Sequence, residues 1–130
     1  MRALLDTHSF LWWAEGGANL SDRAYKILAD PTNELLLSSV VMIEVAILVY
    51  NNKIALARPV KSFFEEQISL FGWKPFPISI DHVDRVSTLP LNRQHKDPHD
   101  RLLIAQGLFE NLPIVSCDAR FPSYGVQTLW

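Results

Sequence analysis

The stretch from Leu35 to Tyr50, LLLSSVVMIEVAILVY, is the feature that most restricts the fold, because this long apolar run carries a single charge at Glu44. A lone carboxylate in an apolar setting costs several kcal/mol unless a partner compensates its charge. The run is shorter than the roughly 20 residues that span a bilayer, and its serines and glutamate also argue against a membrane segment. We therefore expect it to be folded with Glu44 facing a compensating group.

The length and composition predict one domain, residues 1–130. The chain has 130 residues, of which 48% are hydrophobic, which is enough for one compact core. Its 12 basic and 14 acidic residues give a net charge of -2, so any site for a polyanion must be local. A single cysteine, Cys117, excludes an intrachain disulfide and is interpreted as a buried small hydrophobic residue. The opening MRALLD has no export signal, which favours the cytoplasm.

Short apolar runs alternate with helical patterns along the chain. The runs predict strands at residues 3–5, 35–37, 76–80, 113–116 and 126–129. Apolar periodicity and capping residues predict helices at residues 10–15, 21–29, 40–50, 59–71 and 80–89, and one that begins at Asp97-Pro98. Residues 118–123 are expected to form a loop. Such alternation predicts an α/β sandwich around a mostly parallel sheet.

Four acids lie where these elements begin or end. Asp6 and Asp118 follow predicted strands, while Glu44 and Asp100 lie in the early turns of predicted helices. Chemistry in parallel sheets gathers at the carboxyl ends of the strands, so the four carboxylates are expected to converge there. Their mutual repulsion would require a counter-charge, and hard oxygen ligands suit Mg²⁺ or Mn²⁺ better than zinc. Such a cation would explain the charge at Glu44.

Each acid also has a structural explanation. Asp97 is most simply the cap of the helix that follows it, and Asp6 could cap a helix in the same way. Asp100 would gain from the helix dipole, and Asp118 could shape its loop. Glu44 could instead form a buried ion pair with an arginine, the candidates being Arg2 and Arg101.

The remaining polar and aromatic residues give weaker signals. Four basic residues could form a small rim for phosphates, with a solvated loop as the alternative: Arg93, Lys96, Arg101 and Arg120. The histidines around Asp97 lack the nitrogen and sulfur partners of a tetrahedral zinc site. Most of the aromatic residues are expected in the core, and an exposed subset could mark a protein interface.

Four segments together resemble the PIN-domain family, in particular the VapC-type toxins of bacterial type II toxin-antitoxin systems: LLDTHSFLWW, SVVMIEVAI, HKDPHDRLLIAQ and IVSCDARFPSYGV. The resemblance covers nearly the whole chain, and it implies a three-layer α/β/α sandwich with Mg²⁺- or Mn²⁺-dependent endoribonuclease activity. It implies an acidic quartet, with Asp6 and Asp100 as the main metal ligands: Asp6, Glu44, Asp100 and Asp118. It also implies a further acid and two hydroxyl positions beside the site: Asp97, Thr7 and Ser116. His99 departs from the pattern, where an aromatic residue is more usual.

The family further implies an RNA substrate, a homodimer and a cognate antitoxin that occludes the cleft. The expected reaction is metal-assisted phosphodiester hydrolysis, with Glu44 or Asp118 orienting or deprotonating the water. Two alternatives remain. A phosphatase or receiver-like phosphotransfer enzyme also places an aspartate after its first strand, but Asp6-Thr7-His8 lacks the Asp-x-Asp pair of the phosphatases. A non-catalytic binding module could use the same acids to hold a structural ion.

Overall fold

The computed structural model describes residues 1–91 and 94–130, and its centre is a parallel sheet. All four strand pairings are parallel, in the order β3-β2-β1-β4-β5, which confirms the sheet type expected from the alternating pattern. The central strands are buried over most of their length, as strands covered on both faces must be. The strands are β1 (Arg2–Leu5), β2 (Glu34–Ser38), β3 (Lys74–Phe76), β4 (Ile114–Val115) and β5 (Thr128–Leu129).

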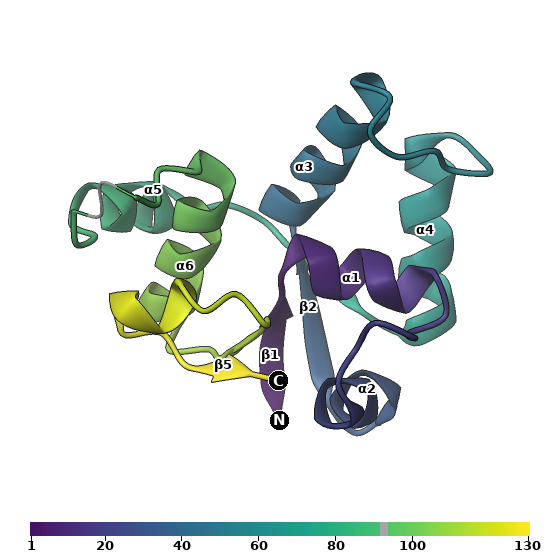
Figure 1. Cartoon of the computed structure of the whole chain (residues 1–130), viewed down its shortest axis with the longest axis horizontal. Coiled ribbons are helices and arrows are strands. Elements are labelled where there is room, and N and C mark those ends of the chain that lie inside the picture. Colours follow the sequence, from purple (N-terminus) through teal and green to yellow (C-terminus); the bar gives the residue numbers. More distant parts are fainter. Residues whose placement is uncertain (92–93) are drawn as a thin grey trace.

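Helices cover both faces of this sheet, as the α/β/α expectation requires. In Figure 1 the central strands lie between α5 and α6 on one side and α1, α2 and α4 on the other. A short 3₁₀ helix, η1 (Phe121–Tyr124), precedes the last strand. The α-helices are α1 (Thr7–Ala14), α2 (Asp22–Ala29), α3 (Ser39–Tyr50), α4 (Val60–Phe71), α5 (Ile80–Ser87) and α6 (Pro98–Glu110).

Serine side chains cap three of the helices. The side chain of Ser21 accepts from the amide of Ala24 at the start of α2, and Ser38 accepts from Val40 at the start of α3. Ser79 and His82 form a reciprocal capping box at α5. These side chains satisfy amides that the first helical turn leaves without partners, which is why local sequence sets these boundaries.

The strand order reverses direction between β1 and β4. From β1 the chain builds outward through β2 to β3, and it then crosses back to place β4 on the other side of β1. Leu5 pairs with Val115, so Asp6 and Ser116 leave neighbouring strands at the same level. A reversal of this kind opens a crevice at the carboxyl edge of the sheet, where ligands of α/β proteins bind.

Three local expectations were wrong. Residues 77–79 are not a strand, because β3 pairs with β2 earlier, at residues 74–76, and Pro77 has no amide to continue the ladder. The loop expected at residues 118–123 contains the start of η1. Cys117 is exposed rather than buried, because it follows β4 at the open edge of the sheet.

No helix within the described residues is both long enough and apolar enough to cross a membrane. The apolar residues instead form one core cluster that extends from β1 and β2 to the helices on both faces. Phe10 on α1 anchors the aromatic part of this core, and its ring contacts those of Phe63, Phe64 and Trp73. Core packing is thus the role of these aromatic residues, as expected.

Candidate metal-binding active site

Asp6 leaves the end of β1 and is almost fully buried, with 6% of its surface exposed. Its Oδ1 accepts a hydrogen bond of 2.7 Å from the amide of Ser9, which makes it the cap of α1. Burial raises the pKa of this carboxyl, and hydrogen bonds from Ser116 and Ser9 oppose the rise. Asp6 is therefore both the cap of α1 and a buried acid at the crevice, so its structural explanation is confirmed and its role as a metal ligand stays a prediction.

Glu44 lies in the second turn of α3, partly buried, and its carboxylate accepts a hydrogen bond from the hydroxyl of Thr7. Burial raises the pKa of Glu44, and the negative charges of Asp100 and Asp97 raise it further. The alternative, an ion pair of Glu44 with Arg2 or Arg101, is not observed. Arg2 binds Glu34 at 2.9 Å, and Arg101 donates to Tyr124. Within the described residues, the neighbours that act on Glu44 are thus Asp100, Asp97 and the imidazole of His99 rather than either arginine.

Asp100 and Asp118 come from α6 and from the segment after β4, and they meet beside His95. Ligand atoms of these three residues all lie within 4.8 Å of one another. Asp118 is bound by Arg120, whose Nη2 and Nε lie 2.7 and 3.0 Å from its two carboxylate oxygens. This contact lowers the pKa of Asp118. The same guanidinium lies 3.7 Å from Asp100.

Asp97 caps α6, as predicted, and it also approaches Glu44. Its Oδ1 accepts from the amides of His99 and Asp100 at 2.9 and 3.1 Å. Ligand atoms of Glu44, Asp97 and His99 form a second group within 4.8 Å of one another. The departure from the family pattern at His99 therefore places an imidazole beside the carboxylates.

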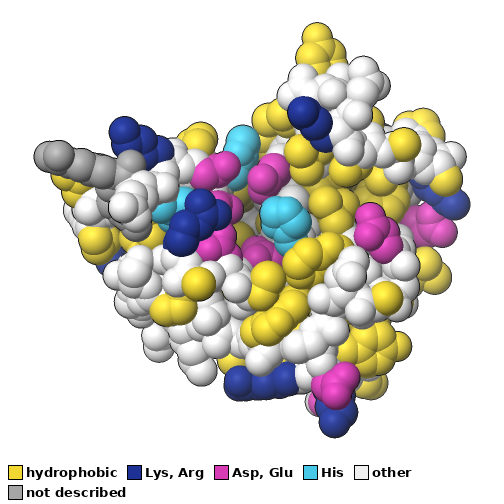
Figure 2. Space-filling view, viewed as in Figure 1, with side chains coloured by type: hydrophobic (Ala, Val, Ile, Leu, Met, Phe, Trp, Pro, Cys, Tyr) yellow, Lys and Arg dark blue, Asp and Glu magenta, His cyan; other side chains and the backbone are white. Residues whose placement is uncertain are grey.

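The acids from four separate segments gather in one region. Ser116 links two of them, because its side chain hydrogen-bonds Asp6 and its Oγ accepts from the amide of Asp118 at 3.1 Å. Glu44 is coupled electrostatically to Asp100. Figure 2 shows the acidic and histidine side chains together in a hollow on one face of the molecule. Thr7 and Ser116 thus contact Glu44 and Asp6, and their role at a functional site stays a prediction.

The donor set fits a hard divalent cation. It consists mainly of carboxylate oxygens, with imidazole nitrogens at its edge, and Mg²⁺ and Mn²⁺ bind such oxygens in preference to sulfur. The raised pKa values of Asp6 and Glu44 show that the protein does not fully compensate these charges. A cation bound by the carboxylates would offset the cost of ionising these buried groups. The residues therefore fit the divalent cation.

The predicted basic rim is only partly on the surface of the site. Arg120 is exposed and contacts Asp118, and Lys96 is exposed in the segment before α6. Arg101 turns inward, because its Nη1 donates to the Tyr124 hydroxyl at 3.1 Å and to the carbonyl of Pro90 at 3.3 Å. Arg93 lies outside the described residues. Arg120 is thus the predicted cation that the described structure places against the acids.

His95 and Tyr124 are the residues beside the site that sequence reasoning missed. His95 is one of the histidines around Asp97 for which the sequence indicates no zinc site, yet it is buried with 1% of its surface exposed. Its Nε2 lies 2.9 Å from Asp100 and its Nδ1 lies 3.0 Å from the Tyr124 hydroxyl. Tyr124 is distant in sequence, so no local pattern could have indicated the pair.

Known proteins resemble the chain over most of its length. A ribonuclease of Mycobacterium tuberculosis named VapC22 is 29% identical over 124 residues, which cover 93% of this chain and 90% of that protein. The structure of VapBC2 from Rickettsia felis, bound to a promoter DNA fragment, superposes with a TM-score of 0.68 at 18% identity, covering 98% of this chain and 97% of that one. FitAcB from Neisseria gonorrhoeae superposes with a TM-score of 0.66 at 17% identity, covering 98% and 96%.

These structural likenesses establish a shared fold, and the match to a protein-family model establishes the family. The PIN domain model matches residues 3–127, which include β2, β3, β4, all of β1 but its first residue, and all of the acids described above. The match also spans Asp6 and Asp118, which lie at opposite ends of the chain and meet through Ser116. The chain belongs to the PIN domain family.

Proposed function

We propose that residues 1–130 form one nuclease domain, which hydrolyses RNA phosphodiester bonds as the toxin of a type II toxin-antitoxin pair. The observation that carries the proposal is the proximity of acids from separate segments: Asp100 lies near Asp118, Ser116 bonds both Asp6 and Asp118, and Glu44 is coupled electrostatically to Asp100. Membership of the PIN domain family and the likeness to a ribonuclease support it. The cytoplasmic location stays a prediction.

The four carboxylates would hold the cation, for which we propose Mg²⁺ or Mn²⁺. Bound there, it would act as a Lewis acid that activates water and stabilises negative charge on the phosphate. Glu44 is suited to orient or deprotonate the water, because its pKa is raised and Thr7 holds its carboxylate. Asp118 is the less suitable base, since Arg120 lowers its pKa.

Arg120 is the residue that we propose as the main phosphate contact. Its guanidinium is exposed and lies between the acids and solvent, 2.7 Å from Asp118 and 3.7 Å from Asp100. A guanidinium in this place can reach a phosphate while it remains near the carboxylates, because its fork offers several N–H donors. The net charge of -2 favours a small binding site and thus a single-stranded or looped RNA.

The experiment that tests this function combines a defined RNA with a small phosphoester. Wild-type protein is incubated with a structured RNA and with p-nitrophenyl phosphate, with Mg²⁺ or Mn²⁺ and with or without chelator. We expect internal cleavage of the RNA that chelator abolishes and that Asp6→Asn reduces by at least a factor of about 1,000, as loss of a unit in a catalytic constellation does. Release of phosphate from the small ester alone would favour the phosphotransfer alternative. Metal binding without either reaction would favour the binding module.

An antitoxin partner follows from the kind of structures that the fold resembles. FitAB bound to the IR36 DNA fragment and a toxin-antitoxin complex from Klebsiella pneumoniae join those above, with TM-scores of 0.68 and 0.60. We propose that this chain also binds a cognate antitoxin, which would occlude the acidic hollow. Co-purification of this chain with the product of a neighbouring gene, followed by loss of RNA cleavage in the complex, would test the proposal.

We also propose a homodimer, as the family resemblance implies. Helix α3 supports it, because its outer face leaves Ile43, Ile47 and Tyr50 exposed at 47%, 42% and 85%. A row of large apolar side chains on one face of a surface helix is typical of a protein interface.

A further inference from the structure

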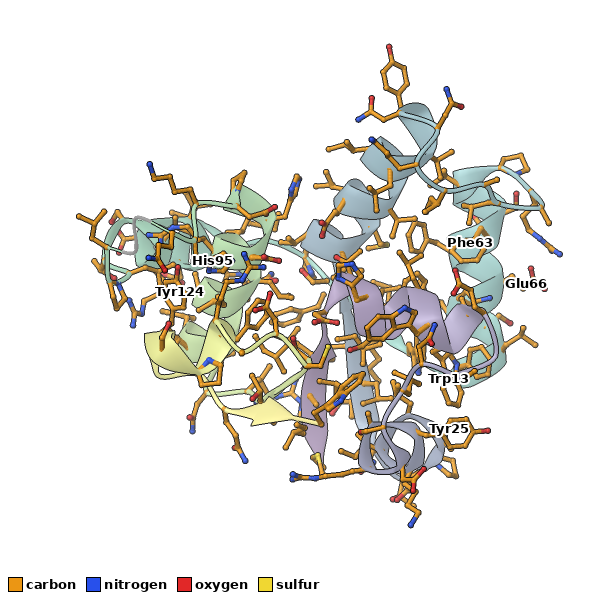
Figure 3. All side chains as sticks on the ribbon, viewed as in Figure 1. Trp13, Tyr25, Phe63, Glu66, His95 and Tyr124 are labelled. Carbon is orange, nitrogen blue, oxygen red and sulfur yellow. The ribbon has the colours of Figure 1, made fainter. Side chains whose placement is uncertain are left out.

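His95 is a buried histidine with a hydrogen-bond partner on each ring nitrogen. Figure 3 shows it beside Tyr124, between the segment that leads into α6 and η1. Its ring also lies near that of Phe121, with centroids 6.2 Å apart. Nothing in the proposed chemistry uses this side chain, yet its Nε2 lies 2.9 Å from Asp100 Oδ2.

The hydrogen bonds around His95 form a connected chain. Arg101 Nη1 donates to the Tyr124 hydroxyl at 3.1 Å, and its guanidinium carbon lies 5.5 Å from the centre of the Tyr124 ring. The hydroxyl lies 3.0 Å from His95 Nδ1 and 3.3 Å from the His95 carbonyl oxygen. Arg101 therefore fixes the tyrosine, and the tyrosine fixes the ring.

The carboxylate of Asp100 determines where the ring carries a proton. In a neutral ring the hydroxyl donates to Nδ1, and Nε2 donates to Asp100. In a protonated ring Nδ1 donates to the hydroxyl oxygen, the hydroxyl donates to the carbonyl, and Nε2 again donates to Asp100. In both arrangements Nε2–H points at Oδ2, because two lone pairs at 2.9 Å would repel.

We infer that Arg101, Tyr124 and His95 form a relay that positions Asp100 for the cation, with His95 as the positioning residue. By holding Oδ2, His95 stops the carboxylate from rotating and leaves its other oxygen free for a ligand. Hydrogen bonds of this kind to metal ligands typically change metal affinity about 10- to 100-fold. The inference rests on the proposed metal-dependent function. It also reassigns Arg101, a candidate for contact with RNA, to an internal role.

The relay joins the two segments that carry Asp100 and Asp118. His95 precedes α6, and Tyr124 lies in η1, which follows Asp118. The bond between His95 and Tyr124 therefore ties one acid-bearing segment to the other, consistent with ligand atoms of His95, Asp100 and Asp118 within 4.8 Å. A variant that breaks the relay should therefore let the Asp100 carboxylate rotate while every carboxylate of the site is still present.

His82 provides a matched control. It is equally buried, at 2% exposure, and its Nε2 lies 2.9 Å from Glu110 Oε1. Its Nδ1 accepts from the amide of Ser79, so it too has partners on both nitrogens. Glu110 ends α6, whereas Asp100 lies in its first turn, so His82 makes the same kind of contact away from the acids.

The test measures Mn²⁺ binding to metal-free full-length protein by electron paramagnetic resonance, with melting temperatures recorded in parallel. The variants are His95→Asn, His95→Gln, Tyr124→Phe and His82→Asn. Glutamine can place its Nε2 where the imidazole Nε2 lies, whereas the shorter asparagine cannot. We expect His95→Asn to weaken Mn²⁺ binding about 10- to 100-fold, and His95→Gln to restore most of the affinity. His82→Asn should lower the melting temperature without changing the affinity.

Equal affinities of His95→Asn and wild type would overturn the relay, as would an equal loss in His82→Asn. If His95→Asn does not fold, Tyr124→Phe decides, because it keeps the ring packing and removes only the hydroxyl, and unchanged affinity would then refute the relay. Wild type that binds Mn²⁺ with the expected order of variants but cleaves no RNA would refute the nuclease and leave the relay supported. Wild type that cleaves RNA while the variants bind Mn²⁺ equally would refute the relay and leave the nuclease supported. Wild type that binds no Mn²⁺ and cleaves no RNA with either cation would refute both.

Discussion

Glu44 and Asp6 lie in positions that favour the neutral forms of their carboxyl groups. Burial raises the pKa of each, and for Glu44 the nearby carboxylates of Asp100 and Asp97 add to the effect. The folded state therefore binds these protons more tightly than the unfolded state. As the pH rises from the ordinary carboxyl values through the raised ones, the cation-free protein loses stability.

Glu44→Gln should stabilise the cation-free protein at neutral pH and abolish most of its activity. The change removes one repelling charge and keeps the side-chain shape, so we expect the melting temperature to rise by a few degrees at pH 7. The gain should vanish near pH 4, where the unfolded state also begins to bind the proton. Thermal melts across this range, with chelator present, measure it. With saturating Mn²⁺ the wild type should instead have the higher melting temperature. A Glu44→Gln protein that is less stable than wild type at pH 7 without cation would contradict the placement of Glu44 among repelling carboxylates.

Arg120→Gln should affect substrate binding more than stability. The ion pair with Asp118 is largely exposed, so its loss should cost less than about 1 kcal/mol. Because Arg120 lowers the pKa of Asp118, the pair stabilises the wild type at neutral pH. This contribution disappears as the pH falls through the folded-state pKa of Asp118, so the difference between wild type and variant should disappear there too. Loss of one phosphate contact should raise the KM for RNA and reduce the slope of log affinity against log salt by about 1. Lys61→Gln, which removes an exposed cation paired with Glu65 on α4, is the control and should leave that slope unchanged.

At the scale of elements, α6 carries the site at one end and core contacts along its middle. Asp97 caps it and Asp100 lies in its first turn, while Gln106 and Gly107 are buried further along. Gln106 accepts a hydrogen bond from Ser38, the cap of α3, and its amide lies 3.3 Å from His82 Nδ1. The bond between Gln106 and Ser38 fixes α6 against the start of α3, the helix that carries Glu44.

Gly107→Ala should destabilise the protein although alanine favours helices. A Cβ at Gly107 would lie 3.0 Å from Val126 Cγ2, 3.1 Å from the Leu112 carbonyl oxygen and 3.2 Å from Ile114 Cδ1. Overpacking of this kind typically costs about 1 to 3 kcal/mol, more than the roughly 1 kcal/mol gained in helix propensity. Urea unfolding would measure the change, with Ser69→Ala on the exposed face of α4 as a control for propensity alone. An unchanged or higher free energy of unfolding would show that α6 can shift to make room.

At the scale of the whole molecule, the exposed side of α3 links the site to assembly. Ile43 and Ile47 flank the helix face next to Glu44, one turn apart. A partner that covers this side would therefore lie close to the acids and bury side chains that are otherwise in water. Formation of the proposed dimer would thus place the second chain next to the acidic hollow.

Ile47→Lys should shift the protein from dimer to monomer. A charged side chain in the apolar part of an interface is unfavourable because its charge must be desolvated. Light scattering after size exclusion should give the mass of one chain for the variant and of two for the wild type. Lys53→Glu, an exposed change beyond the end of α3, is the control and should remain dimeric. A dimeric Ile47→Lys protein would place the interface elsewhere.

Much of the fold follows from local sequence. Short apolar runs in the sequence indicate the buried strands. Caps such as Ser21, Ser38 and Asp97 begin helices through hydrogen bonds to residues two or three positions away. The acids could be found for the same reason, because each lies at the end of a strand or in an early turn of a helix. Where the sequence failed, as at residues 77–79, the pairing with another strand decided the outcome.

The sequence by itself thus determined the order of strands and helices, and it placed Asp6, Glu44, Asp100 and Asp118 at the ends of elements, because these properties depend on neighbours along the chain. Only the tertiary structure decided that β4 returns beside β1, that His95 meets Tyr124, that Arg101 turns inward, and that Cys117 is exposed. Each of these depends on contacts between residues far apart in sequence, and the free energy of such contacts is set by packing that no local pattern encodes.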